Sequence, residues 1–228
     1  MRPVKPILAA LTLLIPATAA AQPQAQFEGM VKGTMSADGM NIEMVQYMKG
    51  SMARVDMTMD DGMSMSTIFD AKSGKMLMIV HDQKMWMDAA MMSAMIPGAS
   101  EASANASKVE IPEFRRTERV ETIAGHECRH YILLLDGVEV DVCAAPGLGC
   151  FIPGAPAGLS RGNATSVPEL PKDAERWLKE FPDGFFILSM TTDNGDASYT
   201  AQALEPGSPP DELFRPPSDY KEMTMPGG

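Results

Sequence analysis

Basic residues are scarce in this chain. It has 19 lysines and arginines against 30 aspartates and glutamates, and its formal net charge is −11 at pH 7. Binding to nucleic acid or to an anionic lipid surface depends on clustered basic side chains. The shortage therefore excludes a general nucleic-acid-binding protein and argues against docking on anionic membranes through a basic patch.

The chain also lacks the short motifs of common enzyme classes. It has no G-x-S-x-G motif, no H-E-x-x-H motif and no glycine-rich phosphate-binding loop. Acidic residues are numerous but stand singly, as they do on a solvated surface. We therefore predict that the protein is not an enzyme and has no catalytic residues, no cofactor and no bound metal ion.

One long apolar stretch is present, and it lies at the N-terminus. Arg2 and Lys5 precede the run ILAALTLLIPATAAA, in which Ala19 and Ala21 occupy the small-residue positions of a signal-peptide cleavage site. The run is too short to span a bilayer as a helix, and no later stretch predicts a membrane span. We expect residues 1–21 to be a cleaved signal peptide, which predicts export to the periplasm or the extracellular medium.

The three cysteines are an odd number, and an oxidising compartment favours one disulfide and one spare thiol. A tight hairpin turn predicted at 136–137 places Cys128 opposite position 145 and makes Cys143 a diagonal neighbour on the same face. We predict a Cys128–Cys143 disulfide, with Cys143–Cys150 as the competing pair.

What the sequence does contain is mostly the pattern of β-strands separated by turns. Turn signals recur at 37–39, 60–62, 72–74 and 82–83. We expect residues 22–228 to form a single β-rich domain. Its expected parts are a first meander at 27–88, a loop at 89–114, a second hairpin region at 115–145, a Gly/Pro-rich excursion at 146–171, a helix at 172–181, a last hairpin at 185–205 and a tail at 206–228.

Methionine is unusually frequent: the chain has 21, and most lie between Met30 and Met95. Short loops at the predicted turns set Met57 opposite Met65, Phe69 opposite Met78, and Met78 opposite Met87. This alternation with period two predicts a one-sided antiparallel meander whose buried face carries the methionines. The other face is polar, with four apolar exceptions: Ile68, Leu77, Ile79 and Trp86.

Two interpretations of the methionines differ in chemistry. As adaptable apolar side chains they suit the lining of a hydrophobic ligand site. As thioethers they suit Cu(I), with His81 and Trp86 nearby, although Trp86 belongs to the opposite face and His81 to a turn. The predicted lining residues are Val55, Met57, Met59, Met63, Met65, Phe69, Met76, Met78, Val80, Met85 and Met87.

The segment HECRH places His126, Cys128 and His130 on one face of a strand, and all three are residue types that bind metals. A single strand spaces its side chains widely, and a fourth ligand would have to come from elsewhere. We interpret Cys128 as half of a disulfide and the two histidines as half-exposed strand residues.

Several longer stretches carry a family resemblance. FEGMVKGTM, YMKGSMARVDM, STIFDAKSGKMLMIVHDQKMWM, ETIAGHECRHYIL, DGVEVDVCAA and DELFRPPSDYKEMTM together resemble the exported bacterial family known as domain of unknown function 4412. That family is similar to the LolA/LolB-type periplasmic carriers. The resemblance implies a strongly curved antiparallel sheet, a LolA-like half-barrel, with one helix packed on its concave face. The family's AG-x-x-C-x-x-Y element falls on Ala124, Gly125, Cys128 and Tyr131, and its second cysteine on Cys143.

These observations predict a monomeric exported protein that binds a lipid, an acylated molecule or another hydrophobic small molecule on a Met-rich concave face. The alternatives are a Cu(I)-binding or methionine oxidant-sink protein, and an envelope structural protein with no ligand.

Overall fold

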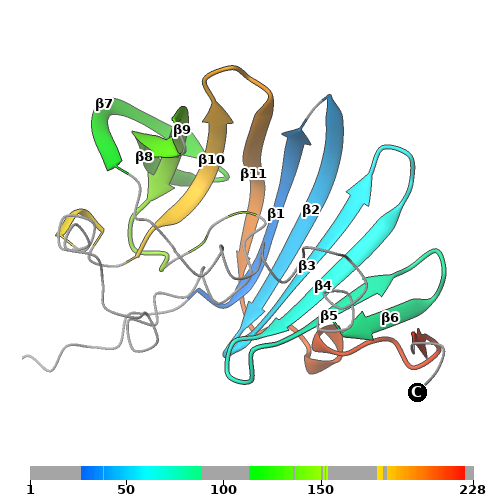
Figure 1. Cartoon of the computed structure of the whole chain (residues 1–228). Coiled ribbons are helices and arrows are strands. Elements are labelled where there is room, and N and C mark those ends of the chain that lie inside the picture. Colours follow the sequence, from blue (N-terminus) through cyan, green and yellow to red (C-terminus); the bar gives the residue numbers. More distant parts are fainter. Residues whose placement is uncertain are drawn as a thin grey trace, which may run out of the picture.

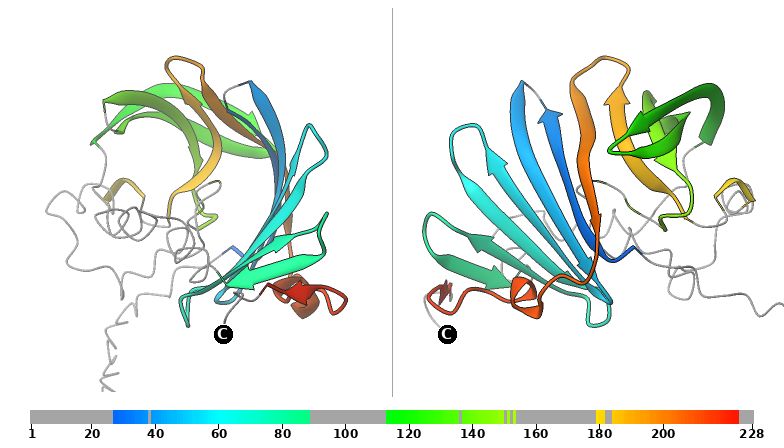
Figure 2. Two further views of the ribbon diagram at one scale, coloured as in Figure 1. Left: turned by 45° about the vertical axis from the view of Figure 1, so that its right-hand side comes forward. Right: turned by 180° about the vertical axis from the view of Figure 1, so that it is seen from behind.

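The computed structural model describes residues 27–37, 39–88, 113–135, 137–149, 151, 153, 179–181 and 184–223. Within them the chain forms one twelve-stranded sheet in the order β12-β6-β5-β4-β3-β2-β1-β11-β10-β9-β8-β7. The sheet is strongly curved and does not close on itself (Figures 1 and 2). Its elements are β1 (Gly29–Ala37), β2 (Met40–Lys49), β3 (Met52–Met59), β4 (Ser64–Asp70), β5 (Lys75–Val80), β6 (Met85–Asp88), β7 (Glu113–Ile123), β8 (His126–Leu135), β9 (Val138–Ala145), β10 (Phe186–Thr192), β11 (Ala197–Pro206), the 3-10 helix η1 (Asp211–Phe214) and β12 (Lys221–Glu222).

The first six strands form the predicted antiparallel meander. Met57 pairs with Met65 and Met78 pairs with Met87, as the turn positions predict. The loop between β4 and β5 has four residues rather than the predicted two, so Phe69 pairs with Met76 and not with Met78. Because this slip is two residues, every side chain keeps its predicted face.

β1 lies in the middle of the sheet because it pairs with β2 on one side and with β11 on the other. The first described strand is thus adjacent to one of the last, and the two halves of the sheet meet there. β10, β9, β8 and β7 continue the sheet by antiparallel pairing.

The C-terminal tail packs on the convex side of the meander (Figure 2). Phe214 of η1 is buried against Ile68 and Ile79, and Trp86 and Tyr220 pack around this cluster. β12 extends the edge of the sheet by pairing in parallel with β6. Residues of the meander whose side chains alternate with Ile68 and Ile79 therefore face the concave side.

Burial on the meander differs from the prediction. Ile68 and Ile79, expected as exceptions on a polar face, are 2% and 0% exposed. The methionines on the concave side are mostly half-buried. The alternation is as predicted. On β4 and β5 the more deeply buried face is the convex one, because the tail covers it. On β1 and β2 it is the concave one, where Val31, Met44 and Met48 belong to the main core.

The second hairpin region also forms as predicted. Leu135 pairs with Val138 across the turn at 136–137. Cys128 and Cys143 form a disulfide with a Cα–Cα distance of 5.3 Å. The ladder between β8 and β9 starts at Arg129 and Ala144, so Cys128 lies just outside it and reaches Cys143 diagonally.

Several predictions fall outside the described residues: the signal peptide at 1–21, most of the loop at 89–114, the excursion beyond residue 153 and the thiol of Cys150. The predicted helix at 172–181 is described only at 179–181, where Lys179 and Glu180 have helical backbone. A helix on the concave face is therefore not supported. In the part of the chain that the structure describes, no helix is long and apolar enough to cross a bilayer.

Candidate functional site

All but one of the predicted lining residues share one face of the sheet. The registers of β3 to β6 place all but Met63 on the concave side. Met63 lies in the turn between β3 and β4, where its carbonyl accepts from the Met59 amide. We call the whole set the Met-rich face. Met63 is exposed, and the others are half-buried. The Met-rich face comprises Val55, Met57, Met59, Met63, Met65, Phe69, Met76, Met78, Val80, Met85 and Met87.

The Met-rich face adjoins the main core of the molecule. Val55, Met57 and Phe69 pack against a cluster that includes Met44 and Met48 of β2. The remaining residues of the face belong to none of the three core clusters that the described residues form. Apolar side chains on β4, β5 and β6 are thus left with part of their surface accessible on the concave side.

A second candidate lies on the convex side, where a serine, a histidine and an aspartate meet. Ser66 is fully buried, and its Oγ lies 2.7 Å from His81 Nε2 and 2.6 Å from Asp56 Oδ1. Arg54 donates to the same Ser66 oxygen at 2.9 Å. His81 Nδ1 lies 2.9 Å from the hydroxyl of Tyr220 in the tail.

Proton counting shows that this group is not a nucleophile and its base. The single hydroxyl proton of Ser66 goes to the Asp56 carboxylate, which can only accept. His81 must then donate from Nε2 to Ser66 and accept at Nδ1 from Tyr220. A histidine that holds its proton on Nε2 cannot take one from the serine. The group instead fixes Tyr220, and with it the tail, to the meander.

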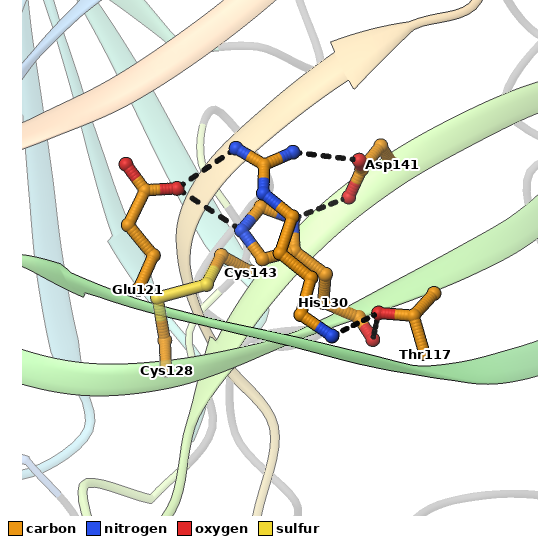
Figure 3. A network of polar contacts seen from close by, with 7 residues as sticks. Thr117, Glu121, Cys128, His130, Asp141 and Cys143 are labelled. Atoms are coloured by element: carbon orange, nitrogen blue, oxygen red, sulfur yellow. Dashed lines mark hydrogen bonds and ion pairs between the residues drawn. A yellow bond between two sulfur atoms is a disulfide. The ribbon is translucent and has the colours of Figure 1, made fainter.

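A third candidate surrounds His130 on β8 (Figure 3). The imidazole is buried, with Nδ1 2.6 Å from Asp141 of β9 and Nε2 3.1 Å from Glu121 of β7. Arg119 pairs with both carboxylates, at 3.0 Å from Glu121 and 3.4 Å from Asp141. Both ring nitrogens of His130 therefore lie within hydrogen-bond distance of a carboxylate.

A cavity of about 490 Å³ lies beside this cluster. Besides the charged groups, the hydroxyl-bearing residues Ser189, Thr191 and Thr200 line it. Glu121 and Asp141 each contact both His130 and Arg119, so both carboxylates already have partners within the protein. No group of three or more His, Cys, Asp or Glu within the described residues is arranged to hold a metal ion.

The histidine predictions have different outcomes. His126 is half-buried, close to the expectation. The expectation for His130 is wrong: its side chain is 4% exposed, and Glu121 and Asp141 give both ring nitrogens a polar partner. Trp86 lies opposite the methionines of β6 and packs in the convex cluster, as its place in the alternation predicts.

Sequence reasoning missed the residues that hold these polar groups. The Arg54, Asp56 and Ser66 network has a weak signal, since all three occupy the polar face of the predicted alternation. The Glu121, His130 and Asp141 contacts join three strands, and no local pattern indicates which of the many single acidic residues meet the histidine.

The family model described as "Domain of unknown function (DUF4412)" matches residues 27–220. No curated protein shows significant sequence similarity to the chain. An uncharacterized conserved protein from Thermus thermophilus has a similar structure, with a TM-score of 0.46 and 9% identity over 86% of this chain and 90% of that one. The structure of PNGF-II in a C2 crystal form gives a TM-score of 0.39 at 12% identity, over 85% of this chain. Here the chain spans only 30% of the length of PNGF-II.

Proposed function

We propose that this chain, which belongs to the DUF4412 family, binds the acyl chain of a lipid or acylated molecule on its Met-rich face. The proposal includes export by the N-terminal segment and a binding role without catalysis. The observation that carries it is the run of half-buried apolar side chains across four neighbouring strands of one concave face.

Physical chemistry favours an acyl chain on such a surface. Apolar side chains that stay partly accessible lose part of the free energy that full burial would provide, at roughly 25 cal/mol per Å². A ligand that covers them recovers that free energy. Methionine has three rotatable bonds and a polarizable sulfur, so a methionine lining adapts to chains of different length and shape.

Cu(I) binding is the rival function, and two contacts weigh against it. His81 uses both ring nitrogens, on Ser66 and Tyr220, so neither is available to a metal near the methionines. Trp86 packs on the convex side. The thioether sulfur atoms of the methionines are themselves suitable Cu(I) ligands. An experiment must therefore distinguish Cu(I) binding from acyl-chain binding.

The test uses exported protein purified without detergent and the apolar fluorescent probe N-phenyl-1-naphthylamine. We expect saturable probe binding, which lipid extracted from the same cells displaces. Met78→Glu places a charge in the centre of the face and should weaken probe binding about tenfold or more. Thr58→Glu is the matched control, because Thr58 is an exposed residue of β3 on the convex side.

A combined Met76→Leu, Met78→Leu, Met85→Leu and Met87→Leu variant separates lining from metal ligation. Leucine conserves volume and apolarity, so probe binding should persist and each change should cost under about 1.5 kcal/mol of stability. Saturable Cu(I) binding by the wild type that this variant loses would favour the rival function. Absence of probe binding, together with absence of lipid in native mass spectra, would rule out the proposal.

A further inference from the structure

Among the residues that the structure describes, two buried side-chain polar atoms have no hydrogen-bond partner: Oε1 of Gln46 and the hydroxyl of Tyr199. Gln46 is 4% exposed and Tyr199 is 1% exposed. Most buried polar atoms are hydrogen-bonded, because an unsatisfied one loses its bonds to water without compensation. Two such atoms in one core therefore require an explanation.

Both residues lie on the concave side, next to the Met-rich face. Gln46 pairs with Val55 and thus shares the side on which the methionines lie. The ring of Tyr199 reaches from β11 over Gly33 of β1, where an added Cβ would come within 2.5 Å of Cε2 and 2.8 Å of the hydroxyl. Met44 of β2 is opposite Gly33, and Gln46 is two residues further along. The two atoms therefore lie over the same pair of strands, beside the apolar face.

The chemistry of the two atoms defines what they can bind. Gln46 Oε1 only accepts hydrogen bonds, so its partner must be a donor. Burial raises the pKa of Tyr199 well above its ordinary value, so the phenol keeps its proton and can donate or accept. The cations of the neighbouring strand positions face the other side, where Lys32 pairs with Glu43 and Arg54 with Asp56. A charged headgroup would be buried here without a counter-ion.

We propose that Gln46 and Tyr199 bind the uncharged hydroxyl or amide group of the ligand whose acyl chain lies on the Met-rich face. This inference rests on the proposed function and names the ligand class: a neutral amphiphile whose polar group donates a hydrogen bond. Ligands that only accept, such as esters, leave Gln46 Oε1 unsatisfied, and carboxylates add the cost of a buried charge. A site built for a hydrogen bond rejects ligands that lack it, because its own polar groups are then left unpaired.

The test measures displacement of N-phenyl-1-naphthylamine by four ligands of one chain length: decanol, decanamide, methyl decanoate and decanoate. We expect decanol and decanamide to displace the probe at about tenfold lower concentration than methyl decanoate, which accepts but cannot donate. Decanoate should be the weakest. A difference between decanol and decanamide identifies which of the two donors the site prefers.

Two variants locate the selectivity. Gln46→Leu should reduce the preference for decanol over methyl decanoate to less than about threefold, because only Gln46 Oε1 requires a donor. Tyr199→Phe should weaken both ligands together, because the phenol can donate to either of them. The affinity for the probe should be kept in both variants. Both should leave the unfolding midpoint of the ligand-free protein unchanged or raised, because each removes an unsatisfied polar atom. The matched controls are Gln202→Leu and Tyr220→Phe, whose polar groups bond Thr34 and His81 and should not affect the preference.

Three outcomes overturn the inference without touching the proposed function. One is a wild type that binds the probe yet treats decanol and methyl decanoate alike. Another is a preference that survives in Gln46→Leu. The last is a lowered unfolding midpoint with unchanged preference, which is the behaviour of two atoms that are satisfied by an internal water molecule. Failure of the probe itself to bind contradicts the proposed function instead.

Discussion

Asp70 fixes the turn that joins β4 to β5 by accepting hydrogen bonds through both carboxylate oxygens. Ser73 donates to one oxygen at 2.7 Å, and Ser51 and the Lys72 amide donate to the other at 2.8 and 3.0 Å. These bonds, with that from Ser73 the largest, lower the pKa of Asp70 to about 2. The unfolded chain has an ordinary aspartate pKa of about 3.9, so the folded state favours the ionised form.

This difference predicts a pH-dependent stability. The contribution of Asp70 is fully present above about pH 4 to 5 and is lost as the pH falls through about 2. Asp70→Asn should therefore lower the unfolding midpoint at pH 7, and the difference from wild type should shrink steadily below pH 4. Thermal unfolding monitored by circular dichroism between pH 2 and 7 measures this. Asp82→Asn is the control, because Asp82 is an exposed residue of the next hairpin turn. If both variants changed the pH dependence of the unfolding midpoint equally, the prediction would be contradicted.

For single residues, the sequence predicts the side of the sheet on which a side chain lies better than its burial or its hydrogen-bond partners. The side on which each methionine of the meander lies follows from alternation alone. The burial of His130 does not, since its partners Glu121 and Asp141 come from two neighbouring strands and meet it only through the ladder registers. The unsatisfied state of Gln46 is likewise a property of the assembled core.

At the scale of elements, the tail is held to the meander by one apolar anchor and several polar contacts. Phe214 fills the space against Ile68 and Ile79. Arg54 donates to the carbonyl of Leu213 at 2.9 Å, and Lys49 pairs with Asp211 at 2.6 Å. The surface ion pair contributes little, so the aromatic ring is expected to dominate.

We predict that Phe214→Ala detaches the tail. Truncating a buried aromatic residue costs roughly 3–5 kcal/mol, enough to expose the convex cluster before the sheet unfolds. Hydrogen exchange should then accelerate at the amides of Lys221 and Met223, which donate to Lys84 and Trp86. Amides of β1 and β11 should keep their protection. Tyr220→Phe is the milder control, because it removes only the hydroxyl that bonds His81. Unchanged exchange at both tail amides would contradict the prediction.

The tail also explains why burial on β4 and β5 differs from the prediction. Turn residues and alternation define two faces, and Ile68, Leu77, Ile79 and Trp86 stand out on the polar one. Four apolar residues on such a face indicate a covering element, but the pattern does not say which segment covers them. The segment that covers them is distant in the sequence: His81 and Tyr220, which contact each other there, are separated by 139 residues.

At the scale of the whole molecule, the Cys128–Cys143 disulfide joins two strands that already pair. Its closed loop is short, with a sequence separation of 15. Loops of this size contribute about 2–4 kcal/mol to stability, chiefly by restricting the unfolded chain. Reduction should therefore lower the urea midpoint of unfolding by the corresponding amount. The double variant Cys128→Ser, Cys143→Ser should be as unstable as the reduced wild type, and reductant should not change its urea midpoint. A wild-type midpoint that does not change with reductant would contradict this prediction.

The pairing of β1 with β11 has a consequence for the order in which the molecule assembles. Thr34 and Gln202 bond across this boundary although 168 residues separate them, so the middle of the sheet closes only after most of the chain exists. Local hairpins such as β3–β4 can form early, whereas the second hydrogen-bonding edge of β1 stays unpaired until β11 has been made. Contacts between such distant residues slow folding, which for sheet proteins of this kind takes roughly milliseconds to seconds. A nascent chain that stops before β11 therefore carries an open hydrogen-bonding edge on β1, where other chains can add.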